Sequence, residues 1–371
     1  MNLRETLHRY VDDGTLPGAV AIVDRGGRRE VVTAGSVDVE GSRPMAEDTL
    51  FRFASITKPI TAAAVLVLVD DGRLALDDPI GRWLPELAEP KVVRTPSGPL
   101  DDVVPAKRPI TVFDVLTGQA GWGFPSDFTL PAVQALFPVQ GDGREVQSFP
   151  EPGVWLARLA RVPLVYQPGE AWLYDTCSTI QGLLVARASG QSFPEFLAER
   201  IFAPLGMTDT GFVAAPGRST AFYKKTAGGL VLADPPDGQW RTTPALPLGN
   251  GGLAGTAGDW VAFGRMLLAG GAGVLTPEAV RLMTTDHTTA AHREIGALFL
   301  EGQGWGMGGA VDIAVTESWH VPGRYGWVGG TGTAAHVVPA TGTVAVLLTQ
   351  VGEDNPVPPR WMRDFWQAAA A

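Results

Sequence analysis

The stretch LFRFASITKPITAAAVLVLVDDG, residues 50–72, decides how this chain is interpreted. Between Arg52 and Asp70 its only charged side chain is Lys58, which stands in a run of Ala, Ile, Val and Leu. This run predicts a buried helix over residues 54–71 that begins directly after a strand-like segment. An ammonium in such a setting costs several kcal/mol unless it is paired or loses its proton. The lysine therefore needs a chemical explanation.

Ser55 lies three residues before Lys58, so the two side chains share one face of the predicted helix. An amine whose pKa is lowered by apolar surroundings can take the serine proton and leave a nucleophile. The backbone N–H groups of a helix N-terminus favour an oxyanion formed there. The pair predicts serine–lysine acyl-transfer chemistry. The plainer alternatives are that Ser55 caps the helix and that Lys58 extends its ammonium to the surface.

Composition describes a folded globular protein. The chain has 371 residues, of which 45% are hydrophobic and 18% charged, enough for a deep pocket in one large domain or in two to three smaller ones. The net charge of −10 and the lack of a basic block argue against nucleic acid as a partner. A single cysteine, Cys177, excludes an intramolecular disulfide and a cysteine metal cluster. Because the five histidines lack metal-binding spacing, we expect neither a metal nor a cofactor.

Nothing in the sequence predicts a membrane partner. The N-terminal segment, MNLRETLHRYVDDGTLPG, carries scattered charges and no apolar core of a secretory signal. The longest apolar run, residues 60–69, is about half of what a membrane span requires. We therefore expect a soluble, cytoplasmic protein, whose oligomeric state the sequence leaves open.

The order of the predicted elements indicates an α+β fold. Residues 18–38 alternate like a hairpin that turns at Gly26-Gly27, and strands return after residue 302. Helices separated by long loops fill the middle of the chain. We expect an antiparallel sheet formed from both chain termini and flanked by helices. The predicted domains are a discontinuous sheet domain, 1–80 and 295–371, and a mainly helical domain, 81–294, with the active site in the cleft between them.

Several linked motifs give the chain a family resemblance. In order they are FRFASITKPITAAAVLVLVDDGRLALDDPI, TVFDVLTGQAGW, YQPGEAWLYDTCSTIQGLLVARASGQSFPEFLAERIFAPLGMTDTGF, NGGLAGTAGDWVAFGRMLLAGG and YGWVGGTGTAAHVVPATGTVAVLLTQ. Together they resemble the serine beta-lactamase-related hydrolases, and most of all the class C branch with its family VIII carboxylesterases. The resemblance covers nearly the whole chain and implies the beta-lactamase/transpeptidase-like fold.

The resemblance also implies roles for individual residues. Ser55 and Lys58 match the family's S-x-x-K motif as nucleophile and base partner. Tyr174 begins the family's Tyr-x-Asn motif and would relay the proton to the leaving group. Gly330, which follows the third motif, would supply the second oxyanion-hole N–H beside that of Ser55. From the residues alone, Tyr174 is better explained as a core aromatic beside Trp172, and only the resemblance singles it out.

Departures from the family pattern favour esters over lactams. The third motif falls on Trp327-Val328-Gly329, so tryptophan replaces the cation or histidine that lactam-processing members keep. Thr176 replaces the asparagine of the Tyr-x-Asn motif. Gln119-Ala120-Gly121 replaces a more usual His-x-Ser-Gly, and with Trp122 it is assigned to the pocket wall.

We therefore expect a metal-free serine hydrolase, carboxylesterase-like, that cleaves small to medium esters through an acyl-enzyme on Ser55. The alternatives with the same chemistry are a beta-lactamase, a D-amino-acid peptidase and an acyltransferase. An alternative of another class is a catalytically idle ligand-binding homologue. Asp175 is left open between holding a substrate amine and lying in solvent.

Overall fold

The central element is a seven-stranded sheet built from both ends of the chain. The computed structural model describes residues 2–352 and 355–371. The strand order is β2-β1-β13-β12-β11-β10-β9, and all neighbours are antiparallel. The strands are β1 (Gly18–Arg25), β2 (Arg28–Gly35), β9 (Gly304–Trp305), β10 (Ala310–Val311), β11 (Tyr325–Gly329), β12 (Thr333–Val338) and β13 (Thr343–Thr349). The α+β fold with a sheet from both termini is confirmed.

The N-terminal hairpin forms one edge of the sheet and pairs with the last long strand, β13. β1 pairs with β2 around the Gly26-Gly27 turn, as predicted, and on its other side with β13, from Ala19 opposite Thr349 to Arg25 opposite Thr343. Alternate residues of β1 point to opposite faces, so Val20 and Ile22 join one core and Ala19 and Ala21 the other. Both faces of the sheet are therefore covered.

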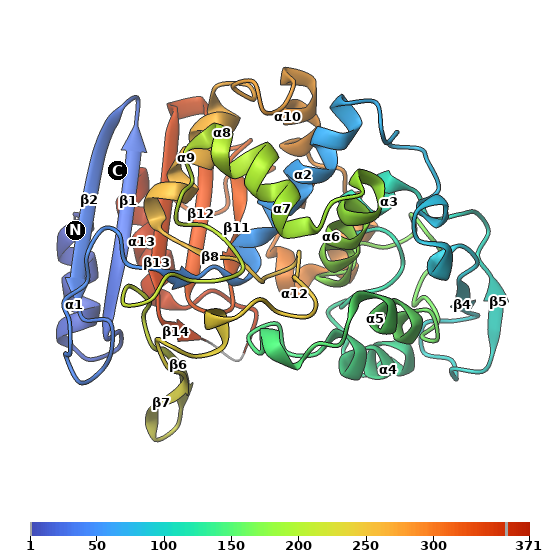
Figure 1. The fold of residues 1–371 in the computed structure, drawn as a ribbon, viewed down its shortest axis with the longest axis horizontal. Coiled ribbons are helices and arrows are strands. Elements are labelled where there is room, and N and C mark those ends of the chain that lie inside the picture. Colours follow the sequence, from blue (N-terminus) through green and yellow to red (C-terminus); the bar gives the residue numbers. More distant parts are fainter. Residues whose placement is uncertain (1, 353–354) are drawn as a thin grey trace.

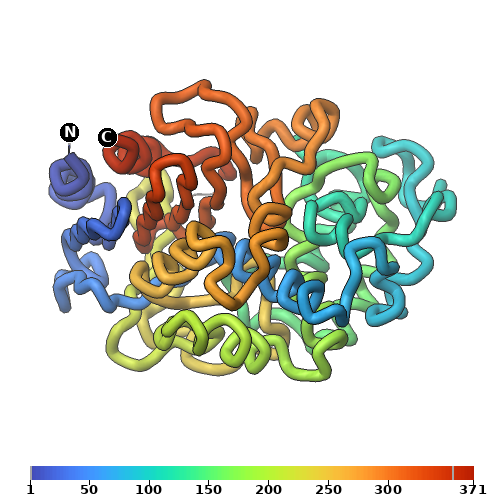
Figure 2. The backbone as a smooth tube through the Cα atoms, turned by 90° about the horizontal axis from the view of Figure 1, so that it is seen from above, coloured from blue at the N-terminus to red at the C-terminus, as the bar shows by residue number. Residues whose placement is uncertain are grey.

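Helices from different parts of the chain provide this cover. α1 (Leu3–Asp12) and α13 (Arg360–Ala370) pack side by side over one face, where the Tyr10 hydroxyl donates to Asp364 at 2.6 Å. Figure 2 shows the two ends of the chain next to each other. α9 (Ala257–Leu268) covers the other face through contacts with β1, β12 and β13. The domain division at residues 81 and 294 stays a prediction. α9 falls within the predicted helical domain by sequence, but it packs against the sheet.

On the side away from the sheet, the molecule is mainly helical (Figure 1). Further helices of the chain are α3 (Val112–Leu116), α4 (Pro131–Gln140), α5 (Pro152–Leu159), α6 (Thr176–Ser189), α7 (Phe193–Leu197), α8 (Ala203–Leu205), α10 (Pro277–Met283), α11 (Ala290–Ile295) and α12 (Ala297–Leu300). Short strands complete the fold: β3 (Phe51–Arg52) with β8 (Ala254–Gly255), β4 (Lys91–Val93) with β5 (Val103–Pro105), and β6 (Phe222–Thr226) with β7 (Gly229–Asp234) and β14 (Val351–Gly352).

The helix that carries the opening stretch joins the two halves. A 3-10 turn, Ala54–Thr57, leads into α2 (Lys58–Asp70), and α2 is buried from Lys58 to Leu68 while it packs against α6. The predicted helix is therefore present, with a tighter first turn. Among the residues that the structure describes, no helix is both long and apolar enough to cross a membrane.

One strand is much shorter than its sequence suggests. The sequence predicts strands after residue 302, but within GMGGAVDIAV, residues 306–315, only β10 pairs. The backbone at Gly308 has a φ of 78° and passes so close to α2 that a Cβ there would lie 2.5 Å from the Lys58 carbonyl oxygen. This contact with α2 replaces regular strand geometry at the start of the segment.

Candidate active site

The backbone before Ser55 is held in an unusual conformation. Ala54 has a φ of 46°, a region that residues other than glycine rarely adopt. The preceding Phe53 anchors this bend, because its N–H donates to the Leu253 carbonyl at 2.8 Å and its carbonyl accepts from the Thr333 hydroxyl at 2.8 Å. The sheet thus fixes the point at which the helix begins and Ser55 enters the site.

Lys58 makes three short polar contacts although its side chain is only 1% exposed. Its Nζ lies 2.7 Å from Ser55 Oγ, 2.7 Å from the Asn250 carbonyl oxygen and 2.7 Å from Asp175 Oδ1. The structure therefore brings the predicted serine and lysine together, and it adds a carboxylate to the pair.

This carboxylate changes the charge expected on the lysine. Burial lowers the pKa of Lys58, but the charge of Asp175 and the Tyr174 hydroxyl raise it more, so the pKa lies above its ordinary value of 10.5. The expectation that apolar surroundings strip the lysine of its proton is wrong. A buried cation with an anion in contact keeps its charge, because the two charges compensate each other's lost hydration.

Asp175 is the functional residue whose part the sequence left undecided. Its Oδ2 accepts hydrogen bonds from Gln140 Nε2 at 2.8 Å and Asn250 Nδ2 at 2.9 Å. Thr176 donates to Gln140 Oε1 at 2.8 Å and so orients that amide. A signal for this role was available, since a buried lysine calls for an anionic partner.

Tyr174 completes the cluster around the serine. Its hydroxyl donates to Ser55 Oγ at 2.8 Å and accepts a hydrogen bond from Trp327 Nε1 at 2.8 Å. The Tyr174 ring stacks on the ring of Phe299 with a centroid distance of 4.6 Å. Lys58 Nζ lies 4.7 Å from the centroid of the Tyr174 ring. Sequence reasoning placed Trp327 in the third motif but missed its N–H as a partner of the tyrosine.

The cluster opens into a cavity of about 580 Å³. Ser55, Tyr174 and Trp327 line it together with Gly329 and Gly330. Aromatic and apolar side chains form much of the remaining wall: Phe137, Phe299, Val328, Pro356, Val357, Pro358, Pro359, Trp361 and Met362. The arrangement places the Ser55 hydroxyl beside an open, largely apolar space.

Gly329 and Gly330 differ in how closely they approach their neighbours. A Cβ on Gly329 would lie 2.1 Å from Thr333 Oγ1 and 2.5 Å from the Phe53 carbonyl oxygen, so the strand touches the segment before Ser55. At Gly330 a Cβ would meet nothing within 4 Å. Within the described residues, no backbone hydrogen bond outside the helices and strands has the N–H of Ser55 or Gly330 as its donor.

The structure places Gln119 and Trp122 elsewhere. Both are buried, and neither lines the cavity around Ser55. Gln119 Nε2 donates to the His287 carbonyl at 3.1 Å, and Trp122 Nε1 donates to the Val162 carbonyl at 2.8 Å. Their polar groups hold loops together in the interior of the helical half.

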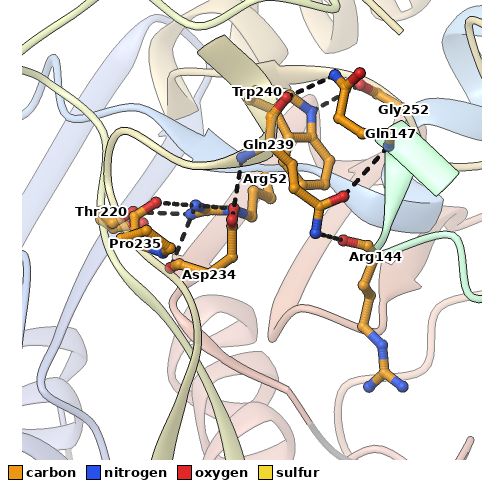
Figure 3. A network of polar contacts seen from close by, with 9 residues as sticks. All are labelled: Arg52, Arg144, Gln147, Thr220, Asp234, Pro235, Gln239, Trp240 and Gly252. Atoms are coloured by element: carbon orange, nitrogen blue, oxygen red, sulfur yellow. Dashed lines mark hydrogen bonds and ion pairs between the residues drawn. The ribbon is translucent and has the colours of Figure 1, made fainter. Parts of the chain in front are cut away.

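A polar network links Arg52, before Ser55 in the sequence, to the cavity rim at Arg144 (Figure 3). Arg52 Nε donates to Asp234 Oδ2 at 2.8 Å, and both side chains are 5% exposed. Gln239 N–H donates to the same carboxylate, and its amide donates to the carbonyl of Arg144, which lines the cavity. Through this chain of contacts, the strand before Ser55 is linked to the rim at Arg144.

Serine, lysine and tyrosine joined at the start of a buried helix, beside an antiparallel sheet, define the serine hydrolases of the beta-lactamase fold. The chain belongs to the Beta-lactamase family, whose model matches residues 3–368. In the part of the chain that the structure describes, no group of three or more His, Cys, Asp or Glu side chains is arranged to hold a metal ion.

Individual relatives support this assignment. Esterase EstB of Burkholderia gladioli is 35% identical over 367 residues, which span 92% of this chain and 87% of the esterase. An uncharacterised protein of Mycobacterium tuberculosis is 37% identical over 371 residues, 94% of this chain and 90% of its own length. The structure of EstCE1, a hydrolase with promiscuous acyltransferase activity, shares the fold with a TM-score of 0.84 at 24% identity, covering 100% of this chain and 97% of the other. The chain is a serine hydrolase.

Proposed function

We propose that this serine hydrolase cleaves carboxylic esters through an acyl-enzyme on Ser55. The observation that carries the proposal is that Ser55 Oγ lies 2.7 Å from Lys58 Nζ and 2.8 Å from the Tyr174 hydroxyl, at the cavity wall. A serine hydroxyl becomes a competent nucleophile when a base within hydrogen-bond reach can take its proton.

In the proposed acylation step, with Lys58 in its neutral form, Ser55 Oγ forms a bond to the ester carbonyl carbon while its proton passes to Lys58 Nζ. The carbonyl oxygen becomes an oxyanion that the N–H groups of Ser55 and Gly330 can stabilise. Collapse of this intermediate breaks the bond to the alcohol oxygen, which receives the proton of the Tyr174 hydroxyl while the Lys58 ammonium gives its proton to the tyrosine oxygen. Water then attacks the acyl group by the same steps in reverse, releases the carboxylic acid and restores the serine.

Esters are favoured over beta-lactams because of Trp327. Its indole occupies the strand position at which lactam-processing relatives keep a cation, and its N–H is already used by Tyr174. A penicillin carboxylate would therefore lack a counter-charge at that strand. The apolar wall of Phe137, Phe299, Trp361 and Met362 suits alkyl or aryl groups of small to medium size. The resemblance to Esterase EstB supports the same choice.

The direct test is hydrolysis of p-nitrophenyl acetate and butyrate by the wild type and by Ser55→Ala. Because the variant lacks the nucleophile, we expect kcat/KM to fall by about 10³-fold or more. Ser97→Ala is the matched control, since Ser97 is an exposed loop residue remote from the cavity lining. A loss of less than tenfold on Ser55→Ala would argue against the proposed nucleophile.

Two further assays separate the alternatives. Nitrocefin turnover comparable to ester turnover would favour a beta-lactamase. A fluorophosphonate probe should label the wild type and leave Ser55→Ala unlabelled, whereas an idle ligand-binding homologue should not be labelled at all. Mass spectrometry of the intact protein after incubation with a panel of esters and lactams would show which acyl group stays on the serine.

A further inference from the structure

The three partners of Lys58 Nζ suit both protonation states of the lysine. The Asn250 carbonyl and the Asp175 carboxylate can only accept hydrogen bonds, whereas the Ser55 hydroxyl can also donate one. An ammonium would donate to all three. A neutral amine would donate to the first two and accept from Ser55. A proton can therefore move from Ser55 Oγ to Lys58 Nζ without a rearrangement of heavy atoms.

Asp175 is held in place by more than its ion pair. The backbone at Asp175 has φ 82° and ψ −61°, and the Thr176 N–H donates to the Tyr174 carbonyl across it at 3.2 Å. This is a γ-turn with positive φ, which is rare and strained for an L-residue. Strain of this kind persists only where the surrounding structure enforces it, and it is concentrated at functional sites.

Both oxygens of the Asp175 carboxylate are occupied. Oδ1 faces Lys58, and Oδ2 accepts from Gln140 and Asn250. These contacts leave the carboxylate poorly placed to hold a substrate amine, which was one of the two roles left open for it. They direct its charge at the lysine instead.

We propose that Asp175 is a positioning residue that stabilises the ammonium form of Lys58 and thereby sets the pH at which Ser55 can be deprotonated. The proposal rests on the ester hydrolysis proposed above. When neutral Lys58 takes the Ser55 proton, the O–H bond breaks, an N–H bond forms, and the new ammonium stands beside an anion already in place. The role parallels that of the aspartate behind the histidine in serine–histidine–aspartate enzymes.

Two groups directly before α6 act strongly on the lysine. The charge of Asp175 raises the pKa of Lys58, and Tyr174 raises it further. Cys177, in the first turn of α6, stays a neutral thiol because burial raises its pKa to about 12. Removal of the Asp175 charge should therefore alter the ionisation of Lys58 more than any other single change.

The test is the pH dependence of kcat/KM for p-nitrophenyl butyrate, which reports ionisations of the free enzyme. In the wild type we expect kcat/KM to rise toward alkaline pH as Lys58 loses its proton. Asp175→Asn removes the anion and keeps a side chain of the same shape. The midpoint of the rise should move down by about 1 to 3 pH units, the usual effect of a charge in contact.

Controls keep this test specific. Asp142→Asn removes a carboxylate that lines the same cavity and is paired with Arg144 and Lys224, so it should leave the midpoint in place. Asp175→Ser removes the same charge without adding an amide beside Gln140 and Asn250, and it replaces Asp175→Asn if that variant does not fold. A residue that only supports the fold would lower activity at every pH without moving the midpoint.

The outcomes separate the two proposals. A wild type that hydrolyses esters only when Ser55 is present, together with an unmoved midpoint in both Asp175 variants, would overturn the role of Asp175 alone. Ester hydrolysis that persists in Ser55→Ala would overturn the proposed function itself. A downward shift in the Asp175 variants, with Asp142→Asn unchanged, supports both.

Discussion

At the scale of single residues, the oxygen of Tyr174 is the link between the serine and the sheet. It contacts Ser55 on one side and receives the Trp327 N–H on the other. A donor aimed at a phenol oxygen stabilises negative charge that develops there when the proton is relayed. Tryptophan at this strand position thus supplies a hydrogen bond to the tyrosine oxygen.

Trp327→Phe tests this hydrogen bond. The phenyl ring keeps most of the packing against Trp305 and Tyr174 but has no N–H to donate. We expect kcat for p-nitrophenyl butyrate to fall by about 10-fold or more, the effect of about 1.4 kcal/mol or more lost in the transition state. The measurement is steady-state kinetics, with circular dichroism to show that the variant is folded.

Trp361→Phe is the matched control for that substitution. Trp361 lines the same cavity, and its Nε1 has no hydrogen-bond partner among the described residues. Loss of its N–H should therefore change kcat little. An equal drop in kcat for both variants would show that indole shape, rather than the hydrogen bond to Tyr174, is what matters.

Residues close in sequence were the easiest to predict. Ser55 and Lys58 share a helical face, so spacing and apolar surroundings were enough to pair them. Tyr174 lies in the extended segment before α6, far from Ser55 in the sequence, and only the family resemblance singled it out. The ion pair with Asp175 could not be located, because it depends on a γ-turn that brings the carboxylate back toward α2. The Trp327 N–H is likewise aimed by packing across the sheet.

At the scale of elements, the contact between β11 and the turn before α2 positions Ser55. Gly329→Ala would place a methyl group 2.1 Å from Thr333 Oγ1 and 2.5 Å from a backbone carbonyl. Because the carbonyl cannot move without shifting the Ser55 turn, we expect both activity and stability to fall, the latter by about 1 to 3 kcal/mol. Thermal unfolding and ester hydrolysis measure the two effects.

Gly330→Ala, at the next residue, is the control for Gly329→Ala. A Cβ at Gly330 meets open space, so this variant should unfold at nearly the wild-type temperature. The substitution also keeps the N–H that is proposed for the oxyanion hole. If the two variants lost stability equally, the close contact at Gly329 would not be what positions the turn.

Elements with regular patterns were predictable, and those shaped by contacts were not. The hairpin 18–38 follows from alternation and a Gly-Gly turn, and β1 and β2 match it. The segment 306–315 has the composition of a strand, but its glycines let the backbone approach α2 and leave the ladder. Local sequence does not reveal such an approach.

At the scale of the whole molecule, a buried histidine makes stability depend on pH. His336 lies on β12 against Trp366 of α13, and burial, with Arg324 and His320 nearby, holds its pKa well below 6.5. The unfolded chain binds a proton there below about pH 6.5 and the folded chain does not, so stability falls as the pH falls.

We expect the melting temperature to decrease as the pH is lowered from about 7 to about 5, with up to about 1.4 kcal/mol of stability lost per pH unit from this one group. His336→Leu should make that dependence shallower, because an apolar side chain binds no proton. His8→Leu, on α1, removes a histidine outside this core and serves as the control. Thermal unfolding followed by circular dichroism at several pH values is the measurement. Equal slopes in wild type and His336→Leu would rule the histidine out as the cause.

The pairing of β1 with β13 has a consequence for biosynthesis. Residues 18–25 leave the ribosome more than three hundred residues before their partner, 343–349, so one edge of the first hairpin stays open during almost the whole of translation. An open strand edge is a template for association with other chains. Slower elongation, lower growth temperature or co-expressed chaperones should therefore raise the soluble yield of this protein more than changes at its finished surface would.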